Sequence, residues 1–157
     1  MGRSTLQEYD VARNRDGVSV RALEAAMLEA GEDAKRLILA GDDMLTVSVA
    51  AALTGCSVYE LSRRRRSNLV LALSVLPGEG VGAYRFPAFQ FEPRVCEVMP
   101  QLLGLFGGRR PWQLYDFLRH PEPLLQGCIP LDLLRCGRAA EVMHVARSAA
   151  RLEQGAH

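Results

Sequence analysis

Lysine and aromatic residues are scarce in this sequence, and long apolar runs are missing. Of its 19 basic residues only Lys35 is a lysine, and aromatic residues make up 6% of the chain. No apolar run approaches the roughly 20 residues that a bilayer-spanning helix needs, which excludes an integral membrane protein. The first residues contain no apolar stretch of the secretory kind. We therefore expect a cytoplasmic protein that has no membrane partner.

The residues that are present have the composition of an ordinary folded protein. The 157 residues are 48% hydrophobic and 24% charged, which suits one or two small domains and excludes a mainly disordered chain. The formal net charge of +1 hides a polarity along the chain. Residues 1–45 are net acidic, residues 46–110 are net basic, and residues 111–157 are balanced. A polyanionic partner is therefore expected on the middle segment.

The chain has four cysteines and no Cys-x-x-Cys pair. Disulfides are not expected in a cytoplasmic protein. Cysteine and histidine nonetheless recur every eight residues, at His120, Cys128, Cys136 and His144. Zinc sites usually place two ligands within a few residues of each other on one short loop, and this spacing does not. We expect buried, inert cysteines and no metal or other cofactor, with a zinc site as the alternative.

Asp116, His120 and His144 are the residues best suited to acid–base catalysis. The sequence contains no serine elbow, no glycine-rich phosphate loop and no His-Glu-x-x-His motif with which these residues could form an active site. His120 falls at an expected helix end, and His144 lies within the expected last helix. An enzymatic function is therefore not expected.

The N-terminal segment, residues 1–42, is expected to be helical. Ser19 is suited to cap a helix whose apolar residues follow i, i+3, i+4 spacing, and Gly31 is expected to end it. A second short helix is expected over residues 32–40. The sequence leaves open whether this helical pair packs on the next domain or mediates dimerisation. The apolar residues of the first helix are Ala22, Leu23, Ala26, Met27 and Ala30.

The segment that follows carries the most informative local pattern. Thr46 predicts the start of an alanine-rich helix over residues 47–53, and Gly55 predicts a tight turn. Ser57 predicts the start of a second helix, and Glu60 three residues later completes a capping box. Two helices joined by a three-residue turn with glycine are the layout of a helix-turn-helix. Its packing residues are expected to be Val49, Ala50 and Leu53 on the first helix and Val58 and Leu61 on the second.

Four adjacent arginines end the second helix. Adjacent guanidinium groups repel one another, whereas against a phosphate backbone they release counterions and bind bidentately. A solvated helix end is the alternative, since cations also favour the C-terminal end of the helix dipole. We predict that this helix contacts double-stranded DNA through the residues left available to a groove. These are Ser57, Tyr59, Glu60, Ser62, Arg63, Arg64, Arg65 and Arg66.

Two runs rich in β-forming residues follow, over residues 68–75 and 84–91, and they flank a loop rich in glycine. This pattern predicts a β-hairpin, which would form the wing of the helix-turn-helix. Pro87 interrupts the second run, so we expect an edge strand or a bulge there. Arg85 is the expected DNA contact of the wing, and the phenylalanines of the second run are expected to form the core beneath it. A winged helix-turn-helix domain is thus expected over residues 43–92.

From residue 93 onward the pattern is helical again. Apolar residues at helical spacing, interrupted by proline and glycine, predict several short helices and a small all-α bundle over residues 93–157. Pro111 and Trp112 open one of these helices, and Trp112 is expected to be buried and to anchor the bundle. The fold class expected for the whole chain is mainly α, with a helix-turn-helix, a β-hairpin wing and a C-terminal helical bundle.

The C-terminal half also resembles a known family. Three elements in order carry the resemblance: Arg85-Phe86-Pro87-Ala88-Phe89-Gln90-Phe91, then Trp112 with Phe117 and Leu118, then Leu125, Gly127, Pro130, Asp132, Leu134 and Gly137. Over residues 84–152 this order is similar to the toxin-binding domain of Xre/MbcA/ParS-type antitoxins. The resemblance implies that this helical domain follows a DNA-binding domain and neutralises a RES-type toxin that consumes NAD. It also implies that the protein represses its own operon. The helix-turn-helix departs from the family pattern, since it is closer to the excisionase or MerR-like winged kind.

The resemblance further implies where a toxin would bind. In the family the C-terminal segment reaches into the active-site cleft of the toxin, so the expected partner surface is the final helix, at Arg138, Glu141, Arg147 and Arg151. A stand-alone regulator whose helical domain serves self-association or another protein partner is the alternative. A homodimer is expected because one short recognition helix reads few base pairs, and a two-fold DNA site doubles the contacts.

Overall fold

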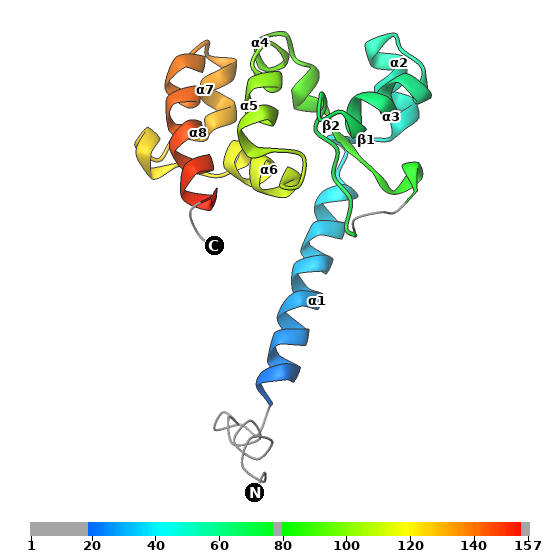
Figure 1. The fold of residues 1–157 in the computed structure, drawn as a ribbon, viewed down its shortest axis with the longest axis vertical. Helices are drawn as coiled ribbons and strands as arrows, with labels where there is room; N and C mark the ends of the chain where they lie inside the picture. Colours follow the sequence, from blue (N-terminus) through cyan, green and yellow to red (C-terminus); the bar gives the residue numbers. More distant parts are fainter. Residues whose placement is uncertain (1–18, 77–79, 155–157) are drawn as a thin grey trace, which may run out of the picture. The chain divides into compact units, whose positions relative to one another are not determined.

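The computed structural model describes residues 19–76 and 80–154 of the chain. The expectations for the start of the chain, for part of the glycine-rich loop and for the last three residues lie outside these ranges. The protein divides into two compact units, residues 1–40 and residues 41–157. It is mainly helical, with one small antiparallel sheet of two strands in the described residues (Figure 1).

The described part of the first unit is one long helix, α1 (Val20–Leu39). The Ser19 hydroxyl accepts a hydrogen bond from the backbone N–H of Ala22 at 3.2 Å, which confirms the predicted N-cap. None of the residues of α1 is buried. The helix therefore begins where the local sequence predicts, but no core holds it.

The predicted break at Gly31 is wrong, because α1 continues through it as a single helix. A glycine inside a helix costs about 1 kcal/mol relative to alanine, which its neighbours offset. Arg36 lies one turn beyond and forms ion pairs with Glu32 at 3.6 Å and with Asp33 at 3.0 Å. Such pairs at i, i+3 and i, i+4 stabilise the turn of helix that directly follows Gly31.

The second unit contains a short sheet, seven α-helices and three 3-10 turns in its described residues. Most of its helices begin with proline or with a hydroxyl cap, which satisfies or removes the unpaired N–H groups of a first turn. In chain order the elements are β1 (Met44–Leu45), α2 (Val47–Thr54), α3 (Val58–Arg66), η1 (Val81–Ala83), β2 (Phe86–Pro87), η2 (Ala88–Phe91), α4 (Pro93–Cys96), α5 (Met99–Phe106), α6 (Pro111–Arg119), η3 (Pro123–Leu125), α7 (Pro130–Arg135) and α8 (Ala139–Gln154).

The sheet is not the predicted hairpin. Strand β2 pairs with β1, which precedes α2 in the chain, and Leu45 lies opposite Phe86. The segment 68–75 forms no strand and makes a single β-bridge with the second run, in which Leu73 and Arg85 exchange two backbone hydrogen bonds of 2.8 Å. Residues 88–91 turn into η2 instead of extending β2. The winged arrangement expected from the sequence is therefore not confirmed.

A buried side chain explains why the segment 68–75 is no strand. The Gln90 amide accepts a hydrogen bond from the Leu71 backbone N–H at 2.8 Å and donates to the Leu71 carbonyl oxygen at 2.8 Å. It also donates to the Pro87 carbonyl oxygen at 3.1 Å. Both backbone groups of Leu71 are thus satisfied without a ladder partner, and buried backbone groups must be satisfied in some way.

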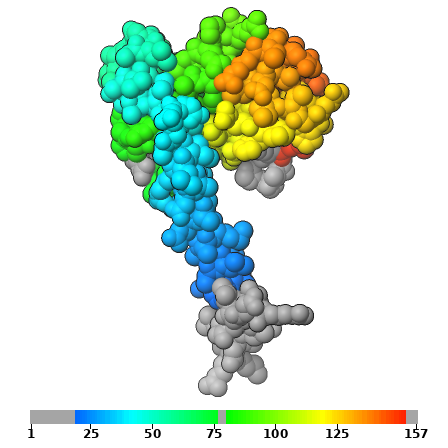
Figure 2. Space-filling view, turned by 180° about the vertical axis from the view of Figure 1, so that it is seen from behind, coloured from blue at the N-terminus to red at the C-terminus, as the bar shows by residue number. Residues whose placement is uncertain are grey.

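Helices α4 to α8 pack against one another as a compact helical body, which Figure 2 shows from behind in green, yellow and orange. Trp112 is largely but not fully buried, as the sequence predicts. Its indole N–H donates to the Ser74 carbonyl oxygen at 2.9 Å, and its ring meets Tyr115 edge-on with centroids 5.7 Å apart. A buried indole N–H usually requires a hydrogen-bond acceptor, and the Ser74 carbonyl oxygen at the edge of the core provides it. The fully buried side chains of the body include Val95, Leu102, Leu114, Leu118, Leu131, Leu134 and Val142.

Hydrogen bonds also cross the boundary expected between residues 92 and 93. The Asn68 side-chain amide donates to the Leu103 carbonyl oxygen at 2.9 Å. Arg135 donates two hydrogen bonds, of 2.9 and 2.8 Å, to the two carboxylate oxygens of Glu92. Residues 41–157 accordingly form one compact unit, and α3 is held on the same body as the C-terminal helices.

Candidate nucleic-acid interface

Helices α2 and α3 are joined by a short turn that local hydrogen bonds specify. The Thr46 hydroxyl caps α2 by accepting from the Val49 N–H at 3.3 Å. Gly55 has φ 69°, a left-handed conformation that glycine adopts without steric cost. The Ser57 hydroxyl then caps α3 by accepting from the Glu60 N–H at 3.0 Å. The predicted helix, glycine turn and capped second helix are present.

The two helices pack through small residues. Ala50 and Ala51 are buried against Leu61 of α3, with Ala72 and Phe86 completing the cluster. The close contact of α2 and α3 depends on these alanines, because a larger side chain would separate the helices. The inward positions expected for Val49, Leu53 and Val58 are wrong, since all three side chains are exposed.

Helix α3 presents one buried and one open face. Leu61 is fully buried, and Ser62 beside it is only 5% exposed, so the prediction that Ser62 contacts a groove is wrong. The open face carries Tyr59, Arg63 and Arg66, which follow one another at i, i+4 and i+7 and are all exposed. We call these three residues the α3 stripe.

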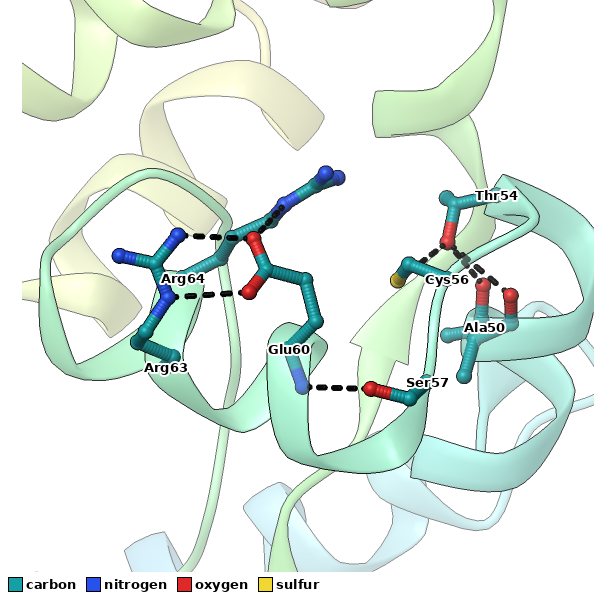
Figure 3. Close-up of polar contacts among 8 residues, drawn as sticks. Ala50, Thr54, Cys56, Ser57, Glu60, Arg63 and Arg64 are labelled. Carbon is teal, nitrogen blue, oxygen red and sulfur yellow. Dashed lines mark hydrogen bonds and ion pairs between the residues drawn. The ribbon is translucent and has the colours of Figure 1, made fainter.

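Glu60 stands beside the α3 stripe and binds two of the arginines (Figure 3). Its two carboxylate oxygens accept hydrogen bonds of 2.9 Å from Nε and a terminal nitrogen of Arg63. One of them also accepts from Nε of Arg64 at 3.2 Å. The capping box is therefore only half made: the Ser57 cap is present, but the carboxylate engages guanidinium groups. Charge-assisted bidentate pairs are among the stronger hydrogen bonds in proteins, which explains this choice.

The four arginines of α3 are consequently not equivalent. Arg63 and Arg64 are partly neutralised by Glu60, and the Arg65 guanidinium lies over the Tyr84 ring, 4.0 Å from its centroid. Arg66 is exposed at the end of the helix, and among the residues that the structure describes no ion pair or hydrogen bond involves its side chain. Stacking on Tyr84 fixes Arg65 against the protein. Arg66 therefore has the guanidinium group most available to a ligand, and Arg63 beside it is exposed but must first exchange its pairing with Glu60.

The ion pairs of Glu60 predict its titration. The Arg63 hydrogen bond holds the pKa of the Glu60 carboxyl at about 2, below its ordinary value of 4.5, and Arg64 adds to this effect. A lowered folded-state pKa means that the pairs stabilise the fold above pH 4.5 and that this contribution is lost as pH falls toward about 2. We expect carbon-detected NMR to report this pKa. In Arg63→Ala the pKa should rise toward 4.5, and a wild-type value already at 4.5 contradicts the pairing.

Arg85 is held against its own loop. Its guanidinium donates to the Gly82 carbonyl oxygen at 2.7 Å and to the Tyr84 carbonyl oxygen at 3.0 Å. These hydrogen bonds order the segment between η1 and β2. Tyr84 belongs to this segment, and its ring contacts the guanidinium group of Arg65. As a DNA contact, Arg85 would first have to release these two carbonyl groups.

Of the residues predicted to bind a protein partner, two lie at the start of α8 and two in its C-terminal half. Arg138 and Glu141 pair with each other through two hydrogen bonds, which occupy the fork of the guanidinium. The pairing raises the pKa of Arg138 and lowers that of Glu141. Arg147 and Arg151 lie four residues apart and are exposed. The structure therefore brings Arg138 and Glu141 together and leaves Arg147 and Arg151 open to solvent.

Sequence reasoning missed three residues that position α3. Tyr84 stacks on Arg65, Gln90 binds the backbone of Leu71, and Asn68 ends the segment after α3 in the left-handed conformation, with φ 57°. Asn68 had a readable signal, because asparagine tolerates this conformation after a helix better than most residues. Tyr84 and Gln90 act across 19 residues of chain, a separation that no local pattern encodes.

The cysteine expectations need correction as well. All four thiols are free, but none is buried: Cys56 and Cys128 are half-buried, and Cys96 and Cys136 are exposed. The described part of the chain contains no group of three or more His, Cys, Asp or Glu side chains that could hold a metal ion. His120 is exposed, with Nδ1 placed 2.9 Å from the carbonyl oxygen of Asp116.

Comparison of the chain with known protein families, curated proteins and solved structures finds no match. No helix within residues 19–76 and 80–154 is long and apolar enough to cross a membrane.

Proposed function

We propose that this protein binds double-stranded DNA through α3 and regulates transcription. The observation that supports the proposal is the α3 stripe. Tyr59, Arg63 and Arg66 lie on one exposed face of a helix whose other face is held on a core by Leu61. A helix presented in this way fits the major groove of B-DNA, which is wide enough to admit it.

The chemistry of α3 suits a polyanion. Arg63 and Arg66 supply guanidinium groups for phosphate oxygens or for guanine edges, and Tyr59 supplies a hydroxyl for a phosphate. Glu60 has two roles in this proposal. First, Arg63 must leave the Glu60 carboxylate before it binds a phosphate, and this cost weakens non-specific binding. Second, the freed Glu60 carboxylate can accept a hydrogen bond from the amino group of cytosine.

The experiment is a salt titration of the purified full-length protein with a fluorescent DNA duplex of mixed sequence. Each phosphate contact contributes a slope of about −0.9 to log K against log salt, so the stripe and its flanking arginines predict a slope of about −2 or steeper. A selection of bound duplexes from a random pool then yields the operator. Binding that is absent at low salt overturns the proposal.

We further propose that the regulator is the antitoxin of a type II toxin–antitoxin system, represses its own operon and neutralises a RES-type toxin. The resemblance over residues 84–152 supports this proposal, and Arg147 and Arg151 add an exposed pair of cations on α8. Such a pair suits an acidic cleft or a phosphate-binding site. A stand-alone regulator whose helical body binds another protein or a second copy of itself is the alternative.

The two possibilities differ in a co-expression experiment with the RES-type protein that the antitoxin proposal places in the same operon. As an antitoxin, the wild-type protein should restore growth, and Arg147→Glu with Arg151→Glu should abolish the rescue while DNA binding is retained. Rescue that survives the double substitution places the neutralising surface elsewhere. No rescue by the wild-type protein favours the stand-alone regulator.

A further inference from the structure

Helix α1 carries an apolar pattern that helical spacing alone does not require. Six of its apolar residues recur with alternating steps of three and four, the a and d positions of a heptad repeat. Five of its seven charged residues, Arg21, Glu29, Glu32, Lys35 and Arg36, fall at the b, c and f positions, on the side away from this row. The a and d residues, which we call the α1 seam, are Val20, Leu23, Met27, Ala30, Ala34 and Leu37.

The α1 seam is exposed along the whole helix. Met27 is 66% exposed and Leu37 is 78% exposed, and none of the residues of α1 is buried. A helix of 20 residues that buries nothing and carries an internal glycine is marginal in water, because helices in proteins owe most of their stability to a packed face. The exposed α1 seam therefore suits a helical partner about 30 Å long, which is the length of α1 itself.

We propose that the α1 seam binds the α1 seam of a second copy of this chain, as an antiparallel two-stranded coiled coil. The sequence of side-chain sizes along the seam supports a second copy in this orientation. A parallel pair would place Ala30 against Ala30 and Ala34 against Ala34, which leaves two adjacent layers of methyl groups and a void. The antiparallel pair joins Val20 with Leu37, Leu23 with Ala34, and Met27 with Ala30 of the partner copy.

The flanking positions fit this close packing. Ala26 and Gly31 flank the middle of the seam and are small enough for the two helices to approach closely. The acidic residues beside the seam, Glu24 and Asp33, face the partner's Gly31 and the partner's Ala26 in this register, so no like charges meet. Antiparallel helices also place the opposite ends of their dipoles together. The sizes of the seam side chains and the positions of the flanking charges therefore favour the same antiparallel register.

The inference does not rest on the proposed DNA function, and it is tested on the full-length chain by sedimentation equilibrium over a concentration series. Wild-type protein should be a dimer that dissociates on dilution. Met27→Glu should weaken the dimer about tenfold or more, because it buries an unpaired carboxylate. The matched control is Leu28→Glu, at a b position of the same helix, which should leave the dimer unchanged.

A mixing experiment tests the orientation and does not depend on any single variant. Mixed Met27→Glu and Ala30→Lys proteins should associate more tightly than either alone, because position 27 faces position 30 of the partner copy only in the antiparallel register. A mixture of Met27→Glu with Met27→Lys should recover less. Tryptophan fluorescence of Trp112 checks that the second unit of each variant is folded. A wild-type monomer at every concentration, equal loss in Leu28→Glu, or better recovery in the second mixture overturns the proposal.

Discussion

Replacing Arg63 and Arg66 together with alanine is expected to weaken duplex DNA binding by about 1–3 kcal/mol for each arginine that bonds a base edge. If the two arginines bind phosphates, the salt slope should instead flatten by about 1 for each arginine removed. Both residues lie on the exposed α3 stripe and neither carries the core, so the fold should be retained. The measurement is the salt titration of the wild-type protein, repeated with the double variant.

The control for this prediction is Arg147→Ala with Arg151→Ala. This variant also removes two exposed arginines from one helix of the same unit, so its net charge equals that of the first variant. It should bind DNA nearly as the wild-type protein does. Equal losses in both variants would show that DNA responds to net charge alone, which contradicts a role for α3 in the groove.

Replacing Gln90 with leucine is expected to destabilise the protein by about 2–6 kcal/mol, because two buried polar groups lose their partner. Leucine has a similar size, but it leaves the buried N–H and carbonyl oxygen of Leu71 without the partners that Gln90 provides at 2.8 Å. Each buried polar group left unsatisfied costs about 1–3 kcal/mol. Urea unfolding followed by circular dichroism measures the free energy of unfolding.

The matched substitution is Gln113→Leu, on the exposed surface of α6, which should change stability by less than about 0.5 kcal/mol. Gln90→Leu should also reduce DNA affinity, because Gln90 fixes the segment that follows α3. A Gln90 variant as stable as the Gln113 variant would mean that water or a strand pairing satisfies Leu71 instead. The long-range account of the β-rich run would then be wrong.

Local chemistry explains what could be predicted at α2 and α3. The hydroxyl caps at Ser19, Thr46 and Ser57 each bond a backbone N–H three residues ahead, and Gly55 needs only its own conformational freedom. These interactions close within one helical turn, so a single sequence contains both partners. The same holds for the row of arginines and for the burial of Leu61, which follow from helical spacing.

Interactions between distant segments decided the rest. The β-rich run of residues 68–75 has the pattern of a strand, but the Gln90 amide hydrogen-bonds the backbone of Leu71. Strand β2 pairs instead with β1, which precedes α2 in the chain. Ser62 reads as a polar surface residue, yet it lies on the side of α3 that the core covers. A pattern of polar and apolar residues cannot register such contacts, because it carries no information on which segment packs on which face.

The sequence by itself determined the mainly helical character, the capped pair of helices and the arginine-rich end of α3, since composition, caps and spacing are local properties. Only the tertiary structure decided that Arg65 lies over the ring of Tyr84, because that ring belongs to a segment 19 residues further along the chain. Glu60 pairs with Arg63 and Arg64 within one turn of α3, and Arg66 is open. Four identical neighbours differ because each side chain leaves the helix about 100° further round and meets different surroundings.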